Sequence, residues 1–327
     1  MNQQLPFVAS RDDPFVEAWF GGGERIGYDP TSRALTSASP LRIFVRHEGE
    51  VSHAVSFMPG FPDGSIGWAT VWPFLPDATD MPKLFFDYIG MGDSDKPKHY
   101  RYATPERTDL VEALWRDLGV KSTTLVAFDF SSLVVLEHLQ RRLERTARGE
   151  ATSSPHIRGV VIFNGGLFTD GHSHPWFTTP FLRMPGGDVA PWLSKHSFTV
   201  FKQIASVMWS KGYGVQDDEM RHLYHALNRH DGLSYLSRAA GFVADHQAQG
   251  DRLDFGRLYR SYRGQFPFLV GGSTEDVFEP RQVTLTQERL GPLGLKVARL
   301  PGGHLTTHEQ PEALAHLITD FERIQRT

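Results

Sequence analysis

The apolar and polar positions along the middle of the chain follow two alternating patterns. Residues 83–88, 125–128 and 159–164 are short apolar runs rich in β-branched or aromatic side chains, which is typical of strands buried in a parallel sheet. Residues 104–118 and 131–147 instead have the composition and length of helices. Because strand and helix alternate, the pattern predicts an α/β fold with a mostly parallel, doubly wound sheet and helices on both of its faces.

The two ends of the chain extend this pattern in different ways. Residues 15–28 and 41–57 alternate enough to predict two or three strands separated by turn-rich segments, so we expect an antiparallel opening. Toward the other end the strand and helix alternation resumes with a strand at 266–271, a helix at 281–290, a strand at 295–300 and a helix at 311–324.

A long region without strand signals lies between these parts. Its apolar side chains fall at helical spacing, as shown by Phe198, Phe201, Ala205, Met208, Met220, Leu223, Tyr224 and Leu227. We therefore expect a helical cap inserted into an α/β core. The predicted division is a first core part at 1–167, a cap at 168–256 and a second core part at 257–327.

Composition narrows the classes of function. The 327 residues are 40% hydrophobic and 22% charged, as in an ordinary soluble enzyme. A formal net charge of −4 provides no basic surface, so nucleic acid is not an expected partner. The sequence contains no cysteine, which excludes disulfides, thiolate catalysis and cysteine-bound zinc.

The sequence also carries no targeting signal that we can identify. The start MNQQLPFVAS lacks a basic segment followed by an apolar one, and no run of about 20 apolar residues occurs. We therefore expect a cytoplasmic protein that does not associate with membrane. The oligomeric state stays open, and a homodimer is compatible with the sequence.

Three polar residues follow predicted strands in an order that has a catalytic meaning. Asp129, Asp276 and His304 each come shortly after a strand, and catalytic groups of such sheets gather at the carboxyl ends of strands. The order nucleophile, acid, histidine is that of the α/β-hydrolases. An aspartate at a strand-to-helix corner is often only a helix cap, but this context favours Asp129 as nucleophile over the neighbouring Ser131.

Longer stretches around these residues are HAVSFMPGFPDGSIGW, FFDYIGMGDSDKP, LVAFDFSS, GGSTEDVFEP and PGGHLTTHEQPE. They resemble, over nearly the whole chain, the α/β-hydrolases that use an aspartate nucleophile, namely epoxide hydrolases and haloalkane dehalogenases. Within that group, residues 162–168 and 93–97 are similar to mesoderm-specific transcript proteins and their bacterial relatives. The resemblance implies an α/β-hydrolase fold and a reaction without a cofactor.

The resemblance also implies a role for each residue. The Asp129 carboxylate attacks an sp³ carbon of an epoxide or an alkyl halide and forms an alkyl ester. His304 then deprotonates the water that cleaves this ester, while Asp276 orients the imidazole. The backbone N–H groups of Phe61 and Phe130 form the oxyanion hole.

Three positions depart from the family pattern. Pro59 stands where the family has the histidine of His-Gly-x-Pro. Phe130 stands where dehalogenases carry a halide-binding tryptophan, and Phe61 where they often carry an asparagine. Because neither phenylalanine has a side-chain N–H for a halide, the leading interpretation is an epoxide hydrolase that acts on an apolar, mid-sized small molecule. A haloalkane dehalogenase and a catalytically silent binding protein are the alternatives.

The sequence marks the substrate-facing residues less clearly. Epoxide hydrolases protonate the opening oxygen with cap tyrosines, for which Tyr213 and Tyr235 are the candidates and His172 or His174 the alternatives. The predicted substrate-binding set is Phe61, Trp176, Tyr213 and Tyr235.

Neither a metal nor a nucleotide is expected. His304 and His308 are four residues apart, but no glutamate follows the first of them and Pro301-Gly302-Gly303 places it in a loop. Gly90-Met91-Gly92 lacks the third glycine of a dinucleotide-binding turn, because Asp95 occupies that position.

Overall fold

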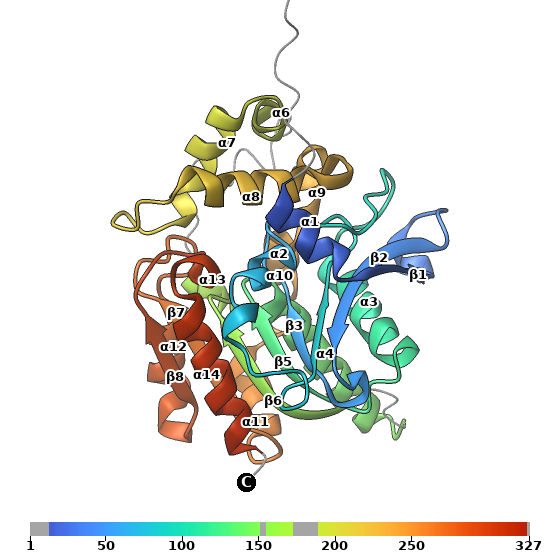
Figure 1. Cartoon of the computed structure of the whole chain (residues 1–327). Helices are drawn as coiled ribbons and strands as arrows, with labels where there is room; N and C mark the ends of the chain where they lie inside the picture. The colour runs from blue at the N-terminus through green and yellow to red at the C-terminus, as the bar shows by residue number, and fades with distance from the viewer. Residues whose placement is uncertain (1–12, 151–154, 173–188, 326–327) are drawn as a thin grey trace, which may run out of the picture.

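The computed structural model describes residues 13–150, 155–172 and 189–325. Within this part, an eight-stranded sheet runs in the order β1-β2-β4-β3-β5-β6-β7-β8, with helices on both faces (Figure 1). The pairs β1–β2 and β2–β4 are antiparallel and the remaining pairs are parallel. The strands are β1 Glu24–Tyr28, β2 Leu41–Glu48, β3 Val55–Met58, β4 Lys83–Phe86, β5 Ser122–Phe128, β6 His156–Phe163, β7 Phe268–Ser273 and β8 Lys296–Leu300. The predicted α/β class and mostly parallel sheet are confirmed.

The helices are distributed along the whole described chain. They are α1 Pro14–Gly21, α2 Ile66–Ala69, α3 Thr104–Asp117, α4 Ser131–Ala147, α6 Val189–His196, α7 Phe198–Ala205, α8 Asp217–Asn228, α9 Leu236–Ala239, α10 Phe242–Gln249, α11 Phe255–Tyr262, α12 Gln282–Leu290, α13 Thr306–Glu309 and α14 Pro311–Ile324. None of these helices combines the length and the hydrophobicity that a membrane-spanning segment of the described residues would need.

Two apolar cores lie on opposite faces of the sheet. In β5, Leu125 and Ala127 pack into the core shared with α3, α4 and α11, whereas Val126 and Phe128 pack into the core shared with α1, α2 and α14. Successive side chains of a strand point to opposite faces. Since both faces are covered, the strand is apolar on both faces from Leu125 to Phe128 rather than alternating.

The expected antiparallel opening is only partly correct. β1 and β2 do pair antiparallel, but residues 14–21 form helix α1 instead of a strand. The Asp13 side chain accepts hydrogen bonds from the backbone N–H groups of Phe15 at 3.0 Å and Val16 at 3.2 Å, which caps the helix. Pro14 suits the first helical turn, so capping decides a segment that the apolar pattern alone misassigned.

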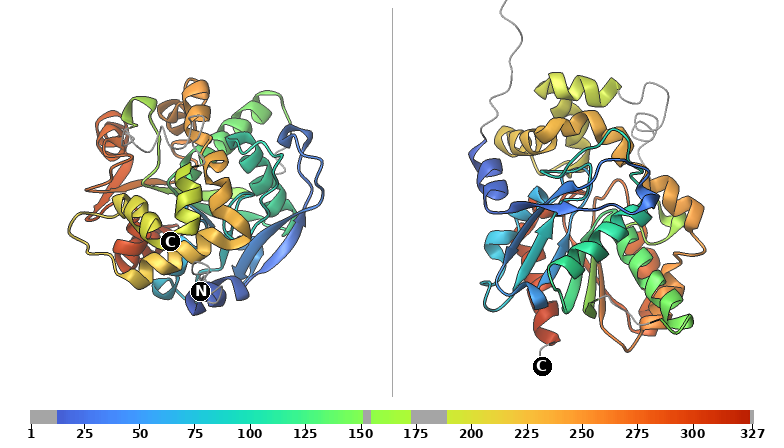
Figure 2. Two further views of the ribbon diagram at one scale, coloured as in Figure 1. Left: turned by 90° about the horizontal axis from the view of Figure 1, so that it is seen from above. Right: turned by 90° about the vertical axis from the view of Figure 1, so that its right-hand side faces the viewer.

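A helical layer covers one end of the sheet. Figures 1 and 2 show α6, α7, α8 and α9 stacked above the strands. The backbone N–H of Leu305, in the loop after β8, donates to the Met208 carbonyl at 3.2 Å, so this layer meets the carboxyl ends of the strands. Helix α11 runs across residue 256, where the sequence predicted a domain boundary.

The buried face of α4 generates a test of the fold. Leu136 is fully buried, and its replacement by alanine should lower the free energy of unfolding by about 2–5 kcal/mol, because the lost apolar contacts leave a cavity. The matched change Leu35→Ala, at a side chain that is 72% exposed, should cost under about 0.5 kcal/mol. Urea unfolding of both variants provides the measurement, and similar losses would contradict the assigned core.

Candidate active site

Asp129 occupies the sharp corner between β5 and α4. Its φ of 52° is in the left-handed region, which residues other than glycine rarely adopt. Its N–H donates to the Phe163 carbonyl at 3.0 Å, so β6 holds the corner in place. A Cβ at Gly60 would lie 2.4 Å from a Phe128 ring carbon and 3.2 Å from the Asp129 Cβ. Only glycine therefore lets the loop after β3 approach this corner.

That loop brings a hydrogen-bond donor to the Asp129 carboxylate. The Phe61 N–H donates to Asp129 Oδ2 at 2.9 Å. Phe130 follows Asp129 directly and precedes the first residue of α4. The structure thus brings the predicted oxyanion residues Phe61 and Phe130 to either side of Asp129, with one backbone N–H already on the carboxylate.

The loops after β7 and β8 bring Asp276 and His304 to the same place. His304 Nδ1 lies 3.0 Å from both Asp276 carboxylate oxygens, and His304 Nε2 lies 3.4 Å from Asp129 Oδ1. Asp276 also accepts hydrogen bonds from the N–H groups of Phe278 at 2.8 Å and Glu279 at 3.2 Å. Since Asp276 engages Nδ1, the tautomer with a proton there directs Nε2 at Asp129.

The charges around His304 favour its protonated form. Burial alone disfavours a charged imidazolium, but the negative charges of Asp276 and Asp129, with their hydrogen bonds, outweigh it and raise the pKa of His304 well above the usual 6.5. The side chain is only 2% exposed. His304 is therefore a cation between two carboxylates, and loss of either negative charge would make it more acidic.

Asn164, at the end of β6, anchors the His304 loop and was given no role in the sequence analysis. Its side-chain amide donates to the His304 carbonyl at 2.6 Å and to Thr306 Oγ1 at 2.9 Å. Its carbonyl oxygen accepts from the Ser273 N–H at 2.8 Å. One side chain thus ties β6 to the loops after β7 and β8. The only sequence signal is an asparagine before Gly165-Gly166, where it takes a φ of 50°.

A second buried carboxyl group lies two residues after Phe61. Burial raises the pKa of Asp63 to about 7, and the negative charge of Asp129 adds to this effect, while the positive charge of His304 opposes it. Neither Asp63 oxygen has a hydrogen-bond donor within the described part of the chain. Asp63 is therefore about half protonated near pH 7, whereas an exposed aspartate is ionised there.

Known proteins resemble this chain in sequence and in fold. No protein-family model matches the chain. The chain is 27% identical over 242 residues to mesoderm-specific transcript homolog protein of Bos taurus, a match that covers 70% of this chain and 67% of the relative. Its fold is similar to haloalkane dehalogenase DatA from Agrobacterium tumefaciens C58 (TM-score 0.66, 19% identity, 94% of this chain and 99% of that chain). It is also similar to a thermophilic esterase from Thermogutta terrifontis (TM-score 0.65, 14% identity, 93% and 100%).

The chain has the α/β-hydrolase fold. Its sheet order, and the positions of Asp129, Asp276 and His304 after β5, β7 and β8, follow from that fold.

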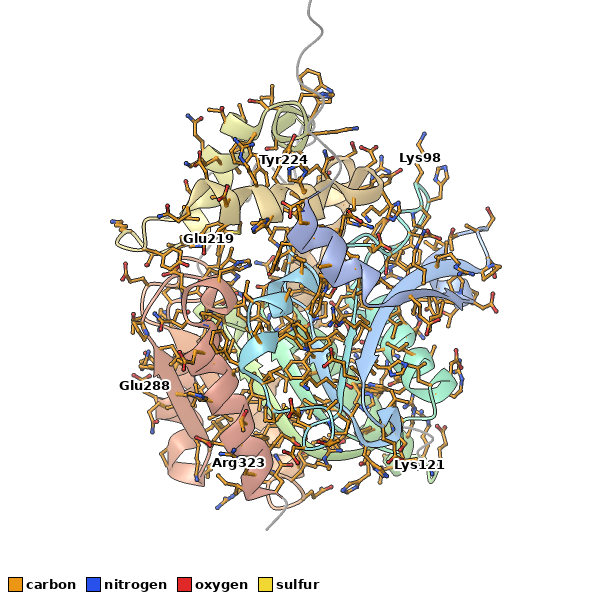
Figure 3. All side chains as sticks on the ribbon, viewed as in Figure 1. Lys98, Lys121, Glu219, Tyr224, Glu288 and Arg323 are labelled. Atoms are coloured by element: carbon orange, nitrogen blue, oxygen red, sulfur yellow. The ribbon has the colours of Figure 1, made fainter. Side chains whose placement is uncertain are left out.

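The predicted substrate-facing tyrosines of this α/β-hydrolase lie in the helical layer. The Tyr213 hydroxyl donates to Glu219 at 2.7 Å and lies 3.3 Å from the His308 carbonyl, so it is directed into that layer, where Figure 3 labels Glu219. Tyr235 is half-buried, with the Arg238 guanidinium carbon 5.5 Å from its ring centroid.

The other predicted residues are placed as follows. His172 forms hydrogen bonds through both ring nitrogens, to Glu279 at 2.7 Å and to His246 at 2.6 Å, so it is held in a buried network. Trp176 and His174 lie outside the described residues.

Phe242 of α10 packs against Phe130 and Phe61, and the sequence analysis did not single it out. Its ring stacks on Phe130, with centroids 5.0 Å apart and an interplanar angle of 29°, and packs edge-on against Phe61 at 5.4 Å. Three aromatic rings therefore form one apolar wall beside Asp129. Because α10 is far from α4 in sequence, no local pattern could reveal this contact.

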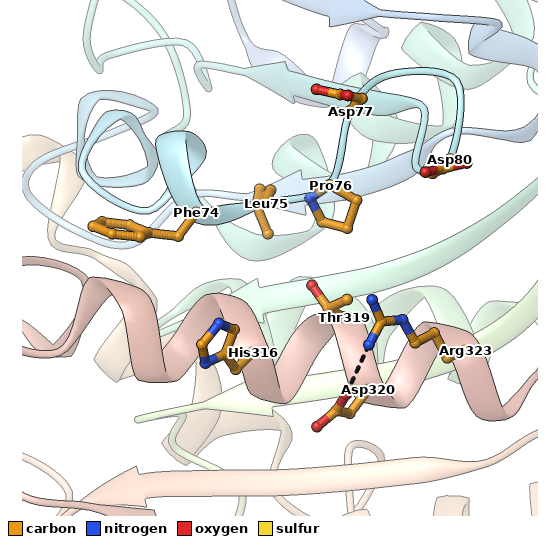
Figure 4. Close-up of a pocket in the computed structure, with 9 residues that line it drawn as sticks. All are labelled: Phe74, Leu75, Pro76, Asp77, Asp80, His316, Thr319, Asp320 and Arg323. Atoms are coloured by element: carbon orange, nitrogen blue, oxygen red, sulfur yellow. Dashed lines mark ion pairs between the residues drawn. The ribbon is translucent and has the colours of Figure 1, made fainter.

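Other features of the described structure are separate from this site. No group of three or more His, Cys, Asp or Glu side chains among the described residues could hold a metal ion. A surface groove of about 480 Å³ lies between η3 (Trp72–Phe74) and α14, lined by Phe74, Leu75, Pro76, Asp77, Asp80, His316, Thr319, Asp320 and Arg323 (Figure 4). It includes none of the predicted site residues.

The contacts of Asn164 lead to a first test of the site. Asn164→Ala should lower the free energy of unfolding by about 1–3 kcal/mol, because buried partners in three segments lose their hydrogen bonds. The matched change Asn228→Ala, at the half-buried end of α8, should cost much less. Urea unfolding measures both, and equal losses would argue against the anchoring role.

The environment of Asp63 predicts a pH effect on stability. The folded-state pKa of Asp63 is about 7, above the ordinary 3.8. Between these two pH values the folded protein keeps a proton that the unfolded chain loses. The contribution of protonated Asp63 to the free energy of unfolding therefore disappears as the pH rises from 3.8 to 7. The stability difference, wild type minus Asp63→Asn, should therefore fall by on the order of 1 kcal/mol per unit between pH 5 and 7. Urea unfolding across this range, with the exposed-site variant Asp80→Asn as control, measures it. A difference that does not change with pH would exclude a raised pKa.

Proposed function

We propose that this α/β-hydrolase opens epoxides, with Asp129 as nucleophile, His304 as base and Asp276 as the group that orients His304. The observation that carries the proposal is the single constellation in which His304 Nε2 lies 3.4 Å from Asp129 while Nδ1 lies 3.0 Å from Asp276. The similarity to the relative from Bos taurus covers 70% of the chain. The epoxide reaction itself rests on the chemistry of these groups.

The first step uses the carboxylate directly. Asp129 Oδ1, on the side of His304, attacks an sp³ ring carbon of the epoxide, and the ring C–O bond breaks to leave an alkoxide that must be protonated. The Phe61 N–H stays on Oδ2 and holds the carboxylate during this attack. Tyr235 is the proposed proton donor among the predicted residues, since the Tyr213 hydroxyl is bound to Glu219.

The second step uses the charge change that the first produces. Once Asp129 is an ester, its negative charge no longer supports the imidazolium, so the pKa of His304 falls. The imidazolium then returns its proton, through solvent, to the Tyr235 oxygen that gave one up in the first step, and the neutral ring can accept a proton from water. The hydroxide attacks the Asp129 carboxyl carbon, and the Phe61 N–H stabilises the oxyanion that forms. The diol leaves, and Asp129 and His304 return to their ionised forms.

Two other hydrolytic reactions have weaker support. A serine hydrolase would need Ser131, but Ser131 Oγ donates to the Pro59 carbonyl at 2.6 Å and lies 3.0 Å from the Tyr88 hydroxyl, while His304 Nε2 is directed at Asp129. A haloalkane dehalogenase would use the same Asp129 ester. The rings of Phe61 and Phe130 offer no N–H to a halide.

A single-turnover reaction in ¹⁸O-water tests the covalent step. With styrene oxide as probe, the first diol formed should contain no ¹⁸O, and the peptide that contains Asp129 should gain one ¹⁸O atom, since water attacks the enzyme ester rather than the substrate. His304→Gln should stop after the first step and leave the ester mass on that peptide.

Peptide mass spectrometry reads both results, and Asp129→Asn is the control that should show neither. A labelled first diol with an unlabelled peptide would mean that water attacks the substrate directly. Halide release from a bromoalkane, with no epoxide opening, would instead identify a dehalogenase.

A further inference from the structure

Arg107 is a buried cation without an ionic partner in the described structure. It lies in the first turn of α3 and is 2% exposed. One terminal nitrogen, Nη2, donates to the Ala239 carbonyl, which lies in the helical layer. The Nε and Nη1 atoms are buried and have no hydrogen-bond acceptor among the described residues. Two of its donor groups are therefore unused.

The acidic groups near Arg107 compensate its charge only weakly. The Oδ2 atom of Asp245, in α10, accepts a hydrogen bond from the Thr104 N–H at 2.7 Å. Glu106 is fully buried, and burial raises its pKa, which favours its neutral form. None of the ion pairs between described residues includes Arg107.

Such a charge is expensive to keep in a protein interior. Removing a guanidinium from water costs several kcal/mol unless partners replace the lost hydration. Contact with an aromatic ring returns about 0.5–2 kcal/mol of this. The remaining cost is of the kind that proteins retain where a charge has a function.

Arg107 lies against the same aromatic wall as the nucleophile. Its guanidinium carbon is 4.6 Å from the Phe130 ring centroid and 5.8 Å from that of Phe242, and these two centroids are 5.0 Å apart. The guanidinium is therefore close to both rings, which also stack on each other. Phe130 directly follows Asp129 in the chain, which places the cation beside the proposed substrate site.

We infer that Arg107 recognises a carboxylate at one end of an otherwise apolar substrate, through its unused N–H donors and its buried charge. This inference rests on the proposed function, because it places the carboxylate in the pocket of Asp129. The rings of Phe61, Phe130 and Phe242 hold the apolar body. The single positive charge of Arg107 balances the single negative charge of a carboxylate. A phosphate dianion would keep one unbalanced negative charge near the Asp129 carboxylate. The sequence analysis expects an apolar substrate, and this inference adds one carboxylate to it.

Equilibrium binding tests this without any turnover. Phenylacetate and phenylacetamide have nearly the same shape and differ in charge, so titration calorimetry of both isolates the role of the cation. The wild type should bind the acid at least about tenfold more tightly than the amide, because a buried charge pair forms only with the acid. Arg107→Gln should abolish this preference, and Arg107→Lys should keep part of it.

Arg238→Gln is the matched control, because it removes an exposed cation that contacts Tyr235 in the helical layer. Its preference for the acid should equal that of the wild type. A wild type that binds the amide as tightly as the acid would overturn the inference, and so would an Arg107→Gln variant that keeps the preference. If Arg107→Gln does not fold, the wild-type comparison and Arg107→Lys still decide.

Turnover separates this inference from the proposed function. The wild type should open 3-phenylglycidate with a higher kcat/KM than its methyl ester, mainly through KM, since the carboxylate is bound in both ground and transition states. Opening of the ester but not the acid would contradict the role of Arg107 and leave epoxide opening intact. Arg107-dependent binding of phenylacetate, with neither epoxide opened, would instead contradict the proposed function alone.

Discussion

The left-handed backbone at Asp129 is the constraint on which the rest of the site depends. A φ of 52° at a residue with a side chain costs on the order of 1–3 kcal/mol, and the surrounding structure must hold it. Two contacts do so: the Asp129 N–H donates to the Phe163 carbonyl, and Gly60 leaves room for the corner. The same close approach brings the Phe61 N–H onto the carboxylate. Strain at the corner and preorganisation of the site therefore have one structural origin.

The charged states of Asp129, Asp276 and His304 depend on one another. His304 lies between Asp129 and Asp276, and burial makes each of these charges depend on the others. Asp63 adds a carboxyl group whose pKa burial raises to about 7, so it carries only part of a negative charge near neutral pH. Asn164 holds the His304 loop without adding charge. A neutral anchor is suited to this position, because another ion would shift the pKa of His304.

The helical layer contacts the core beside Asp129. Through Phe242, helix α10 completes an aromatic wall with Phe61 and Phe130, and the Ala239 carbonyl of α9 accepts a hydrogen bond from Arg107. The proposed reacting groups therefore lie in the core, while the surroundings of Arg107 and Phe130 depend on the contact between core and layer. This division agrees with the way superfolds support different reactions on one scaffold.

The sequence by itself determined the elements whose signals are local. Helices 131–147 and 311–324 were predicted with the bounds that the structure shows, because helical periodicity and flanking residues act over a few turns. The order of Asp129, Asp276 and His304 was likewise readable, since each follows a strand of recognisable composition. Helix α1 was misassigned because its Asp13 cap outweighs an ambiguous apolar pattern.

Only the tertiary structure decided how distant segments meet. The roles of Asn164, Phe242 and Arg107 depend on contacts with residues far along the chain, and the pKa of Asp63 depends on burial by other elements. None of these contacts can be read from the spacing of apolar residues in the sequence. That spacing shows which face of a helix or strand is buried, but not which residues cover that face. The sequence therefore indicated Asp129 as the proposed nucleophile, whereas packing between the core and the helical layer decided its surroundings.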